Sequence, residues 1–473
     1  MKTKAGRIVR FILRWTIALL GIAWVVANVH LRDRVLVLDD NNRPVDRALV
    51  ESASETDASF LVDMPGGPQR IAGERVVNPP DRKTVKLAGA KDATAKLLGM
   101  RLDGPADKKP NVLELLVLDE GGTRGRFVSP QEVRGGFELD VPQPRVQTGV
   151  AAMVRSADRR LLVASFAVIP ITVLCTTFRW HRLLLALGIA MPLARAFVLN
   201  MVGAFYNTFM PGSTGGDVLK AYYAAKAAPQ RRTAAVMSVI IDRVLGLLAL
   251  IILGGTMAAI QFARSPDAGD PTARACLQVA VAAATILTCT VIGVTVLYSQ
   301  ALRKLLAVGA ILRRVPMQEK VWKIVDVLRL YRERPMLMLW AVLVTFPVHI
   351  TVVVSAMLAG QAFGLPISPL YYFIVVPVVV LTGAIPITPQ GVGVMEAFAF
   401  YLTKQQGATV NEALALTMSI RLVAMAFNLL GGLFVLRGGY HTPTEQETAE
   451  LSSAEPAGDG GDENVECRVP NVE

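Results

Sequence analysis

The chain has 473 residues, of which 52% are hydrophobic, and its formal net charge is +11. The mean hydropathy is +0.43, and the apolar residues gather in long runs, which is typical of polytopic membrane proteins. The positive charge lies beside these runs, so it favours membrane orientation signals and argues against a nucleic-acid partner. The four cysteines and four histidines show neither a disulfide framework nor metal-ligand spacing. We therefore expect no metal site and no other cofactor.

Residues 1–30 are predicted to form an N-terminal signal anchor. Phe11–Val29 is apolar and long enough to span a bilayer, with lysines and arginines concentrated at its start. No convincing small-residue cleavage site follows, so the segment is expected to remain as an anchor. The positive-inside rule then places the N-terminus in the cytoplasm.

Residues 31–155 are expected to form a small, mostly β extracytoplasmic domain. Short alternating or β-branched runs at Arg34–Leu38, Val112–Leu118 and Gly136–Val141 are separated by turn dipeptides. A helix is expected near Ala93–Leu98. Acidic and basic residues nearly balance over this segment, which is a candidate surface for an extracytoplasmic partner.

Residues 156–437 are expected to form the transmembrane domain. The further full spans are predicted at Leu161–Phe178, Ala234–Ile260, Cys276–Tyr298, Met336–Gln361 and Ala413–Leu436. Residues 300–334 are strongly basic and are expected to lie on the cytoplasmic side, near anionic headgroups. Residues 438–473 form an acidic tail that is expected to be disordered in the cytoplasm.

Two apolar segments of this domain are broken by clusters of proline and glycine, at Asn207–Asp217 and Pro386–Glu396. The basic clusters on either side of the first segment both have the character of cytoplasmic loops. The arm Arg195–Met210 would cover only about 24 Å as a helix, less than the ~30 Å hydrocarbon core. We therefore predict two re-entrant hairpins, the first entering from the cytoplasm and the second from outside. With six full spans, both termini are cytoplasmic.

The order span, hairpin, span occurs twice, with one linking span between the two units. The units therefore have opposite orientations, which predicts an inverted repeat in an all-α membrane protein. Arg243 follows Asp217 by 26 positions, and Arg421 follows Glu396 by 25. Each unit thus offers an intramembrane acid–arginine pair. Such charges are often functional, and structural neutralisation is the alternative interpretation.

The half-helix after each break offers free N–H groups and a positive dipole end, which suit a phosphate. The glycines allow the sharp turn, and Lys220 adds a cation one turn after Asp217. His349 is expected to be a packed, hydrogen-bonded histidine rather than a proton-linked site. No residue is predicted to be catalytic. The candidate substrate-binding or translocation residues are Asn207, Pro211, Gly212, Gly215, Gly216, Asp217, Lys220, Arg243, Pro389, Gly391, Gly393, Glu396 and Arg421.

Several motifs resemble the lysylphosphatidylglycerol synthase transmembrane-region family, whose members are also called flippase-like proteins. They are Arg179-Trp180 with Leu183-Leu184, the Asn207 to Asp217 string, Asp242-Arg243 with Gly246-Leu247, and Thr388-Pro389 to Glu396. The resemblance covers roughly residues 161–436 and implies a bacterial inner-membrane protein that flips or otherwise handles lipids. Lys220 stands where the family often has arginine, and Gln390 where glycine is usual. Only a short acidic tail follows Leu436, so aminoacyl transfer to lipid is not expected.

These observations favour a lipid translocase-like protein whose partners are membrane lipids with an anionic headgroup or a lipid-linked phosphate. One alternative is a membrane-embedded transferase that uses a lipid-phosphate donor. The other is a non-catalytic scaffold that acts through residues 31–155. The sequence does not decide between a monomer and a homo-oligomer.

Overall fold

The structure is a computed structural model, and it describes most of the chain. The described residues are 16, 19, 20, 23, 27, 29–51, 53, 57–80, 84–87, 94–103, 111–118, 124–133, 144–209, 215–264, 270–299, 335–384, 391–438 and 440–441. The predicted anchor lies almost entirely outside them. So do the strand at Gly136–Val141, the basic segment, most of the acidic tail, and Pro211, Gly212 and Pro389.

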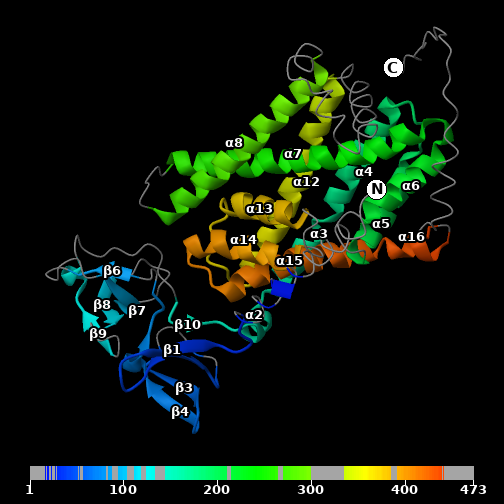
Figure 1. Cartoon of the computed structure of the whole chain (residues 1–473). Helices are drawn as coiled ribbons and strands as arrows, with labels where there is room; N and C mark the ends of the chain where they lie inside the picture. Colours follow the sequence, from blue (N-terminus) through cyan, green and yellow to red (C-terminus); the bar gives the residue numbers. More distant parts are fainter. Residues whose placement is uncertain are drawn as a thin grey trace.

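A small β region precedes and lies beside a larger helical region (Figure 1). All of its strand pairs are antiparallel. The central strand β1 (Arg34–Leu38) pairs with β2 (Pro44–Ala48), β5 (Val76–Val77) and β10 (Val146–Gln147). A hairpin joins β3 (Ser59–Met64) to β4 (Gly67–Ala72). The third sheet has the order β6 (Thr84–Lys86), β7 (Thr94–Asp103), β8 (Asn111–Leu118), β9 (Gly125–Val128). Short 3-10 helices lie at Gly73–Arg75 and Pro130–Glu132.

Two of the strands expected from the sequence, β1 and β8, are confirmed, and β8 begins one residue early. The helix expected near Ala93–Leu98 is wrong, because Thr94–Leu98 belongs to β7. Leu97 pairs with Val117 and Met100 pairs with Leu115, and all four side chains are buried. Burial against the neighbouring strand therefore outweighs the local helix preference of alanine, lysine and leucine.

The helical region begins with α2 (Val150–Ser156), α3 (Arg159–Ala167), α4 (Pro170–Ala186), α5 (Leu193–Phe209), α6 (Gly215–Ala227), α7 (Arg232–Arg264) and α8 (Pro271–Tyr298). It continues with α12 (Pro335–Ala362), α13 (Tyr372–Ala384), α14 (Val394–Thr403), α15 (Val410–Leu429) and α16 (Gly432–Leu436). Short 3-10 helices lie at Pro229–Arg231 and Lys404–Gln406.

Among the described residues, five helical stretches are long and apolar enough to cross a membrane, and each overlaps one predicted span. They are Arg159–Ala186, Pro229–Arg264, Pro271–Val296, Pro335–Ala362 and Val410–Leu436.

Two pairs of shorter helices lie where the broken segments were expected. Helices α5 and α6 have 17 and 13 residues and pack against each other, and we call them the first helix pair. Helices α13 and α14 have 13 and 10 residues, and we call them the second helix pair. A helix of 13 residues is about 20 Å long, less than the ~30 Å hydrocarbon core.

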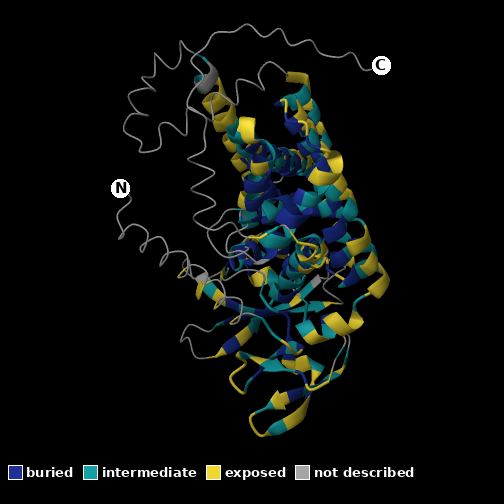
Figure 2. Ribbon diagram, turned by 90° about the vertical axis from the view of Figure 1, so that its right-hand side faces the viewer, coloured by how far each residue is buried: buried dark blue, intermediate teal, exposed yellow. Residues whose placement is uncertain are grey.

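The helix contacts follow a matched pattern. We call α3 to α7 the first half of the helical region and α12 to α16 the second half. In each half the helix pair packs against the long helix that follows it, α6 against α7 and α14 against α15. The first arm of each pair also packs against the long helix of the other half, α13 against α7 and α5 against α15. Helices α4 and α12 pack directly on each other. Buried residues concentrate inside this bundle and exposed ones on its outer faces (Figure 2).

The β region is tied to the helical region at the start of α15. The buried Asn411 amide nitrogen donates to the carbonyl oxygens of His30 (3.0 Å) and Thr148 (2.8 Å). Its Oδ1 accepts from the His30 backbone N–H at 3.0 Å. Asp33 accepts from the Gly149 N–H at 2.8 Å. The two ends of the β region are therefore held at one point of the bundle.

Candidate functional site

The first predicted acid–arginine pair forms in the structure. Asp217 lies in the first turn of α6, and its carboxylate accepts a hydrogen bond from the guanidinium of Arg243 on α7. Arg243 also donates to the carbonyl oxygen of Ala384 at the end of α13, at 3.4 Å. The Asp217 and Arg243 side chains are 31% and 27% exposed. This pair therefore links the first helix pair to the second and stays partly open.

The start of α6 is held closely against α5. The Gly216 N–H donates to the side-chain oxygen of Asn207 at 2.8 Å, so this amide satisfies a donor of the first helical turn. A Cβ on Gly216 would lie 1.8 Å from the carbonyl oxygen of Gly203, which leaves space only for glycine. Gly215 begins the helix. The hydrogen bond from Gly216 to Asn207 and the close approach of Gly216 to Gly203 thus fix the position of the first turn of α6, which carries Asp217.

The second predicted pair also forms, in a more enclosed place. Two guanidinium nitrogens of Arg421 on α15 donate to the two carboxylate oxygens of Glu396 on α14, one of them at 3.3 Å. The Gly393 N–H donates to the same carboxylate at 2.7 Å. The Glu396 and Arg421 side chains are only 2% and 10% exposed. Gly391 and Gly393 have φ values of +71° and +85°, which favour glycine at the start of α14.

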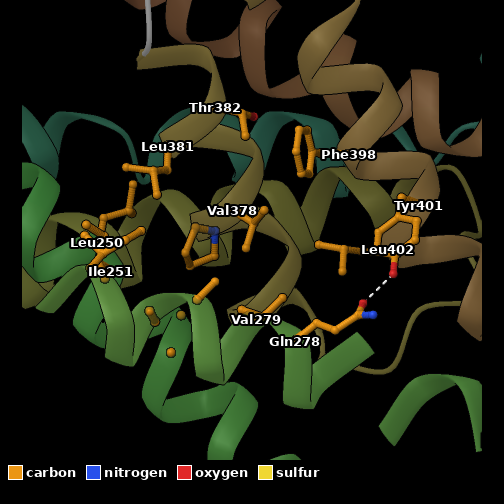
Figure 3. Close-up of a pocket in the computed structure, with 16 residues that line it drawn as sticks. Leu250, Ile251, Gln278, Val279, Val378, Leu381, Thr382, Phe398, Tyr401 and Leu402 are labelled. Atoms are coloured by element: carbon orange, nitrogen blue, oxygen red, sulfur yellow. Dashed lines mark hydrogen bonds between the residues drawn. The ribbon is translucent and has the colours of Figure 1, made fainter. Parts of the chain in front are cut away.

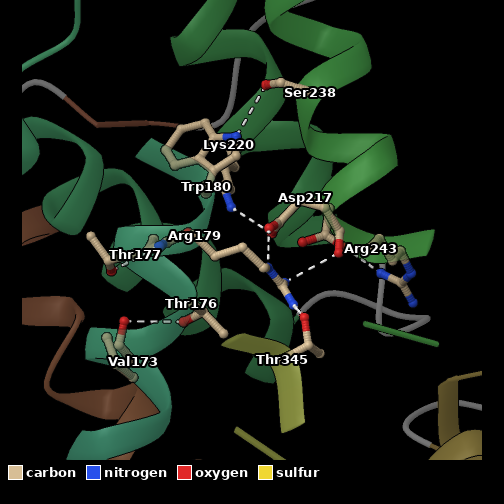
Figure 4. A network of polar contacts seen from close by, with 12 residues as sticks. Val173, Thr176, Thr177, Arg179, Trp180, Asp217, Lys220, Ser238, Arg243 and Thr345 are labelled. Carbon is tan, nitrogen blue, oxygen red and sulfur yellow. Dashed lines mark hydrogen bonds and ion pairs between the residues drawn. The ribbon is translucent and has the colours of Figure 1, made fainter. Parts of the chain in front are cut away.

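A further ionic cluster lies beside the first pair, and it is not among the sequence-based expectations (Figure 4). The buried Asp242 carboxylate accepts from Arg179 Nε at 2.8 Å and from Lys220 Nζ at 3.4 Å. Arg179 also donates to the Thr345 hydroxyl at 2.6 Å. We call Arg179, Lys220 and Asp242 the buried ionic cluster. It joins helices α4, α6, α7 and α12.

An aromatic side chain completes the surroundings of Lys220. The ammonium group lies 3.9 Å from the centroid of the Trp180 ring, close enough for a cation–π interaction. The indole N–H of Trp180 donates to the Ser238 hydroxyl at 3.1 Å, which fixes the ring. Lys220 is therefore buried in this cluster, whereas the sequence interpretation placed it beside a ligand. The signal that could have revealed Asp242 is a lone acid next to Arg243 inside a long apolar run.

A cavity of about 290 Å³ lies between the two halves, and we call it the polar cavity. It brings together three of the predicted residues, Asn207, Arg243 and Arg421. The other lining residues are Thr208, Val380, Gly383, Ala384, Met395, Ile420, Ala424, Met425 and Asn428. Lys220 is not among the described lining residues. The cavity is therefore lined by one arginine from each half of the bundle.

A second cavity of about 240 Å³ adjoins the polar cavity. The two share the lining residues Val380, Ile420, Ala424 and Asn428. Most other side chains around the second cavity are apolar, including Ile169 and Phe427. The cavity that is lined by the two arginines thus continues into one that no described charged residue lines.

The weaker sequence candidates are also placed. His349 is hydrogen bonded from Nε2 to the carbonyl oxygen of Gly246 at 2.8 Å, in agreement with a packed histidine. Within the part of the chain that the structure describes, no group of three or more His, Cys, Asp or Glu side chains could hold a metal ion.

The family comparison matches the helical region. The model of the lysylphosphatidylglycerol synthase TM region matches residues 147–432, more than half of the chain. No curated protein matches the chain. The match begins at the end of β10 and covers both helix pairs and the buried ionic cluster. The chain therefore belongs to the lysylphosphatidylglycerol synthase TM region family, and it is a membrane protein related to lipid metabolism or translocation.

Proposed function

We propose that the protein translocates a lipid whose anionic headgroup, or lipid-linked phosphate, binds in the polar cavity. The observation that carries this proposal is the position of Arg243 and Arg421, which come from different halves of the bundle and line one cavity. Guanidinium groups bind phosphate oxygens through paired, charge-assisted hydrogen bonds. The Asn207 amide lines the same cavity and offers a further polar contact.

The proposal includes an inverted repeat with two re-entrant hairpins. The matched contacts of the two helix pairs support this, because each first arm packs on the long helix of the opposite half. The shortness of all four arms supports re-entry rather than full spans. The distribution of lysines and arginines beside the apolar segments supports an inner-membrane protein with cytoplasmic termini and with residues 31–155 outside.

Binding would proceed by exchange of ionic partners. Each arginine is paired with a carboxylate, so neither guanidinium is left uncompensated in the membrane. A headgroup phosphate would compete with Asp217 or Glu396 for the guanidinium N–H groups. The released carboxylate could then carry a proton in an ion-coupled cycle. The second cavity, of about 240 Å³, adjoins the polar cavity and would take part of the lipid chain.

A flip assay tests this proposal. The purified full chain is placed in liposomes with labelled phosphatidylglycerol or labelled phosphatidylcholine. We expect faster movement of the anionic lipid, and a large loss of that movement in Arg243→Gln with Arg421→Gln. Arg264→Gln, an exposed arginine at the end of α7, is the matched control and should retain transport.

Two outcomes would contradict the proposal. Transport that is unchanged when Asp217→Asn and Glu396→Gln are combined would exclude the acid–arginine pairs from translocation. A covalently altered lipid, detected by mass spectrometry in the same vesicles, would favour the transferase alternative.

A further inference from the structure

A separate cavity of about 340 Å³, which we call the apolar cavity, lies against α13 (Figure 3). It is lined by residues of α7, α8, α13 and α14. On α13, Gly383 and Ala384 line the polar cavity, whereas Val378 and Leu381 line this one. Helix α13 therefore separates a cavity lined by two arginines from a cavity that no described charged residue lines.

Small residues set the inner boundary of the apolar cavity. A Cβ on Gly255 of α7 would lie 2.4 Å from Cβ of Ala283 on α8, so these helices cross very closely there. A Cβ on Gly254 would lie 2.9 Å from Cβ of Pro377, a proline inside α13. Helix α7 thus packs closely against both α8 and α13 beside the cavity.

The lining leaves little for water to bind. None of the described lining residues is charged. The Thr382 hydroxyl donates to the Val379 carbonyl oxygen of its own helix at 2.8 Å. The Tyr401 hydroxyl donates to Gln278 Oε1 at 2.5 Å, joining α14 to α8. Water in an internal site needs two to four polar partners, so a hydrocarbon occupant fits this chamber better.

The mouth of the cavity faces the medium around the spanning helices. Three lining residues, Ile286, Phe398 and Tyr401, are 43%, 43% and 41% exposed. Helix α8, which carries Ile286, is the least buried of the five spanning stretches, with 6% of its window buried. In a membrane protein, the medium beside such a face is lipid hydrocarbon.

We propose that the apolar cavity binds one hydrocarbon chain of a membrane lipid. The polar end of that chain lies at the Gln278–Tyr401 hydrogen bond, near the start of α8 and the end of α14. The chain then runs between the helices toward Leu250 and Leu381, at the opposite end of the cavity (Figure 3). This site does not depend on the proposed translocation, since no side chain of the acid–arginine pairs lines it.

Photo-crosslinking of the full-length protein in bilayers tests the site. The probe is a phosphatidylcholine with a diazirine on one acyl chain, so that an anionic headgroup plays no part. Cross-linked peptides are identified by mass spectrometry. A diazirine near the glycerol should label residues around Gln278 and Tyr401, and one near the chain end should label residues around Leu250 and Leu381.

Two exposed alanines on α8 give a matched pair of variants. Ala282 lines the cavity and Ala284 does not. Ala282→Phe should fill the mouth and lower labelling of α13 and α14 several-fold, whereas Ala284→Phe should leave it unchanged. Labelling should also survive Arg243→Gln with Arg421→Gln, which separates this site from the proposed headgroup site.

Three results would overturn the proposal. Equal labelling in Ala282→Phe and Ala284→Phe would mean that only surrounding bulk lipid is labelled. Labelling without the expected dependence on diazirine position would exclude a chain held in one direction. A cross-link from Val378→Cys to residues 1–28 or 300–334 would mean that another segment of this chain fills the cavity.

Discussion

The two halves of the helical bundle carry the same acid–arginine pair in different surroundings. Asp217 and Arg243 are 31% and 27% exposed, whereas Glu396 and Arg421 are 2% and 10% exposed. The residue three positions after the acid is Lys220 in the first half and Ala399 in the second. The residue before the arginine is Asp242 in the first half and Ile420 in the second. All three charged residues of the buried ionic cluster therefore come from the first half, and two of their positions are apolar in the second half.

This difference separates two ways of holding a charge inside a bundle. Arg179, Lys220 and Asp242 of the first half form a buried cluster that ties α4, α6 and α7 to α12 of the second half, and the acid–arginine pair beside it stays partly exposed. In the second half, the Gly393 N–H and Arg421 satisfy Glu396 directly, and the pair itself is enclosed. The buried charges and the partly exposed pair are thus separate groups in the first half, whereas a single buried pair carries the charges in the second half.

The largest expected effect comes from breaking the buried ionic cluster. Asp242→Asn leaves Arg179 and Lys220 buried without their shared carboxylate, which should cost about 3–5 kcal/mol of unfolding free energy. Thermal unfolding in detergent measures this loss. Ile420→Asn, at the equivalent position, should destabilise the protein less. Adding Lys220→Met to Asp242→Asn should restore part of the loss, and equal melting of the single and double variants would contradict this account.

The second effect compares the two acids. Glu396→Gln should cost about 3 kcal/mol, because the enclosed Arg421 loses its counter-charge. Asp217→Asn should cost about 1 kcal/mol, since its pair is partly exposed and solvent screens it. Unfolding of the two variants under identical conditions measures the difference. If Asp217→Asn were the more destabilising change, the first pair would be the structural one.

The third effect concerns the turn into α14. Gly391→Ala should cost about 1–2 kcal/mol, because φ is +71° and a Cβ would lie 2.7 Å from Cα of Gly383. Gly246→Ala is the matched control, since no heavy atom lies within 4 Å of its added Cβ and helical alanine gains up to about 1 kcal/mol over glycine. Opposite shifts in melting temperature are expected. A neutral Gly391→Ala would show that this turn can relax.

The smallest effect is a pH dependence at the junction of the two regions. Partial burial, and then the Arg34 guanidinium, lower the pKa of His30 from its ordinary 6.5, against a smaller opposite effect of Asp46. The unfolded chain therefore binds more protons, so the junction should be most stable above about pH 6.5 and weaken as pH falls below it. Hydrogen exchange of residues 148–150 at two pH values measures this. His30→Gln should remove the dependence, and an unchanged dependence would assign it to another group.

Much of the bundle could be predicted because hydropathy and charge act along the chain. The five described spans follow from the lengths of the apolar segments. The two acid–arginine pairs were found from the nearly equal separation of acid and arginine in the two repeats of the sequence. The buried ionic cluster could not be predicted, because Arg179, Lys220 and Asp242 meet only through the crossing of separate helices. Adjacent residues on a helix face different directions, so Asp242 turns toward Arg179 while Arg243 reaches Asp217. The β7 stretch was assigned wrongly because its strand pairing is non-local.

The Asn411 junction has a consequence for the modularity of the chain. One side chain bonds the backbone on both sides of the β region, at His30 and at Thr148, so the two ends of that region are neighbours in space. The chain between them leaves the start of α15 at His30 and returns to it at Thr148. We therefore expect that residues 31–147 can be replaced by a short glycine linker, or by a foreign domain, without rethreading any described helix of the bundle.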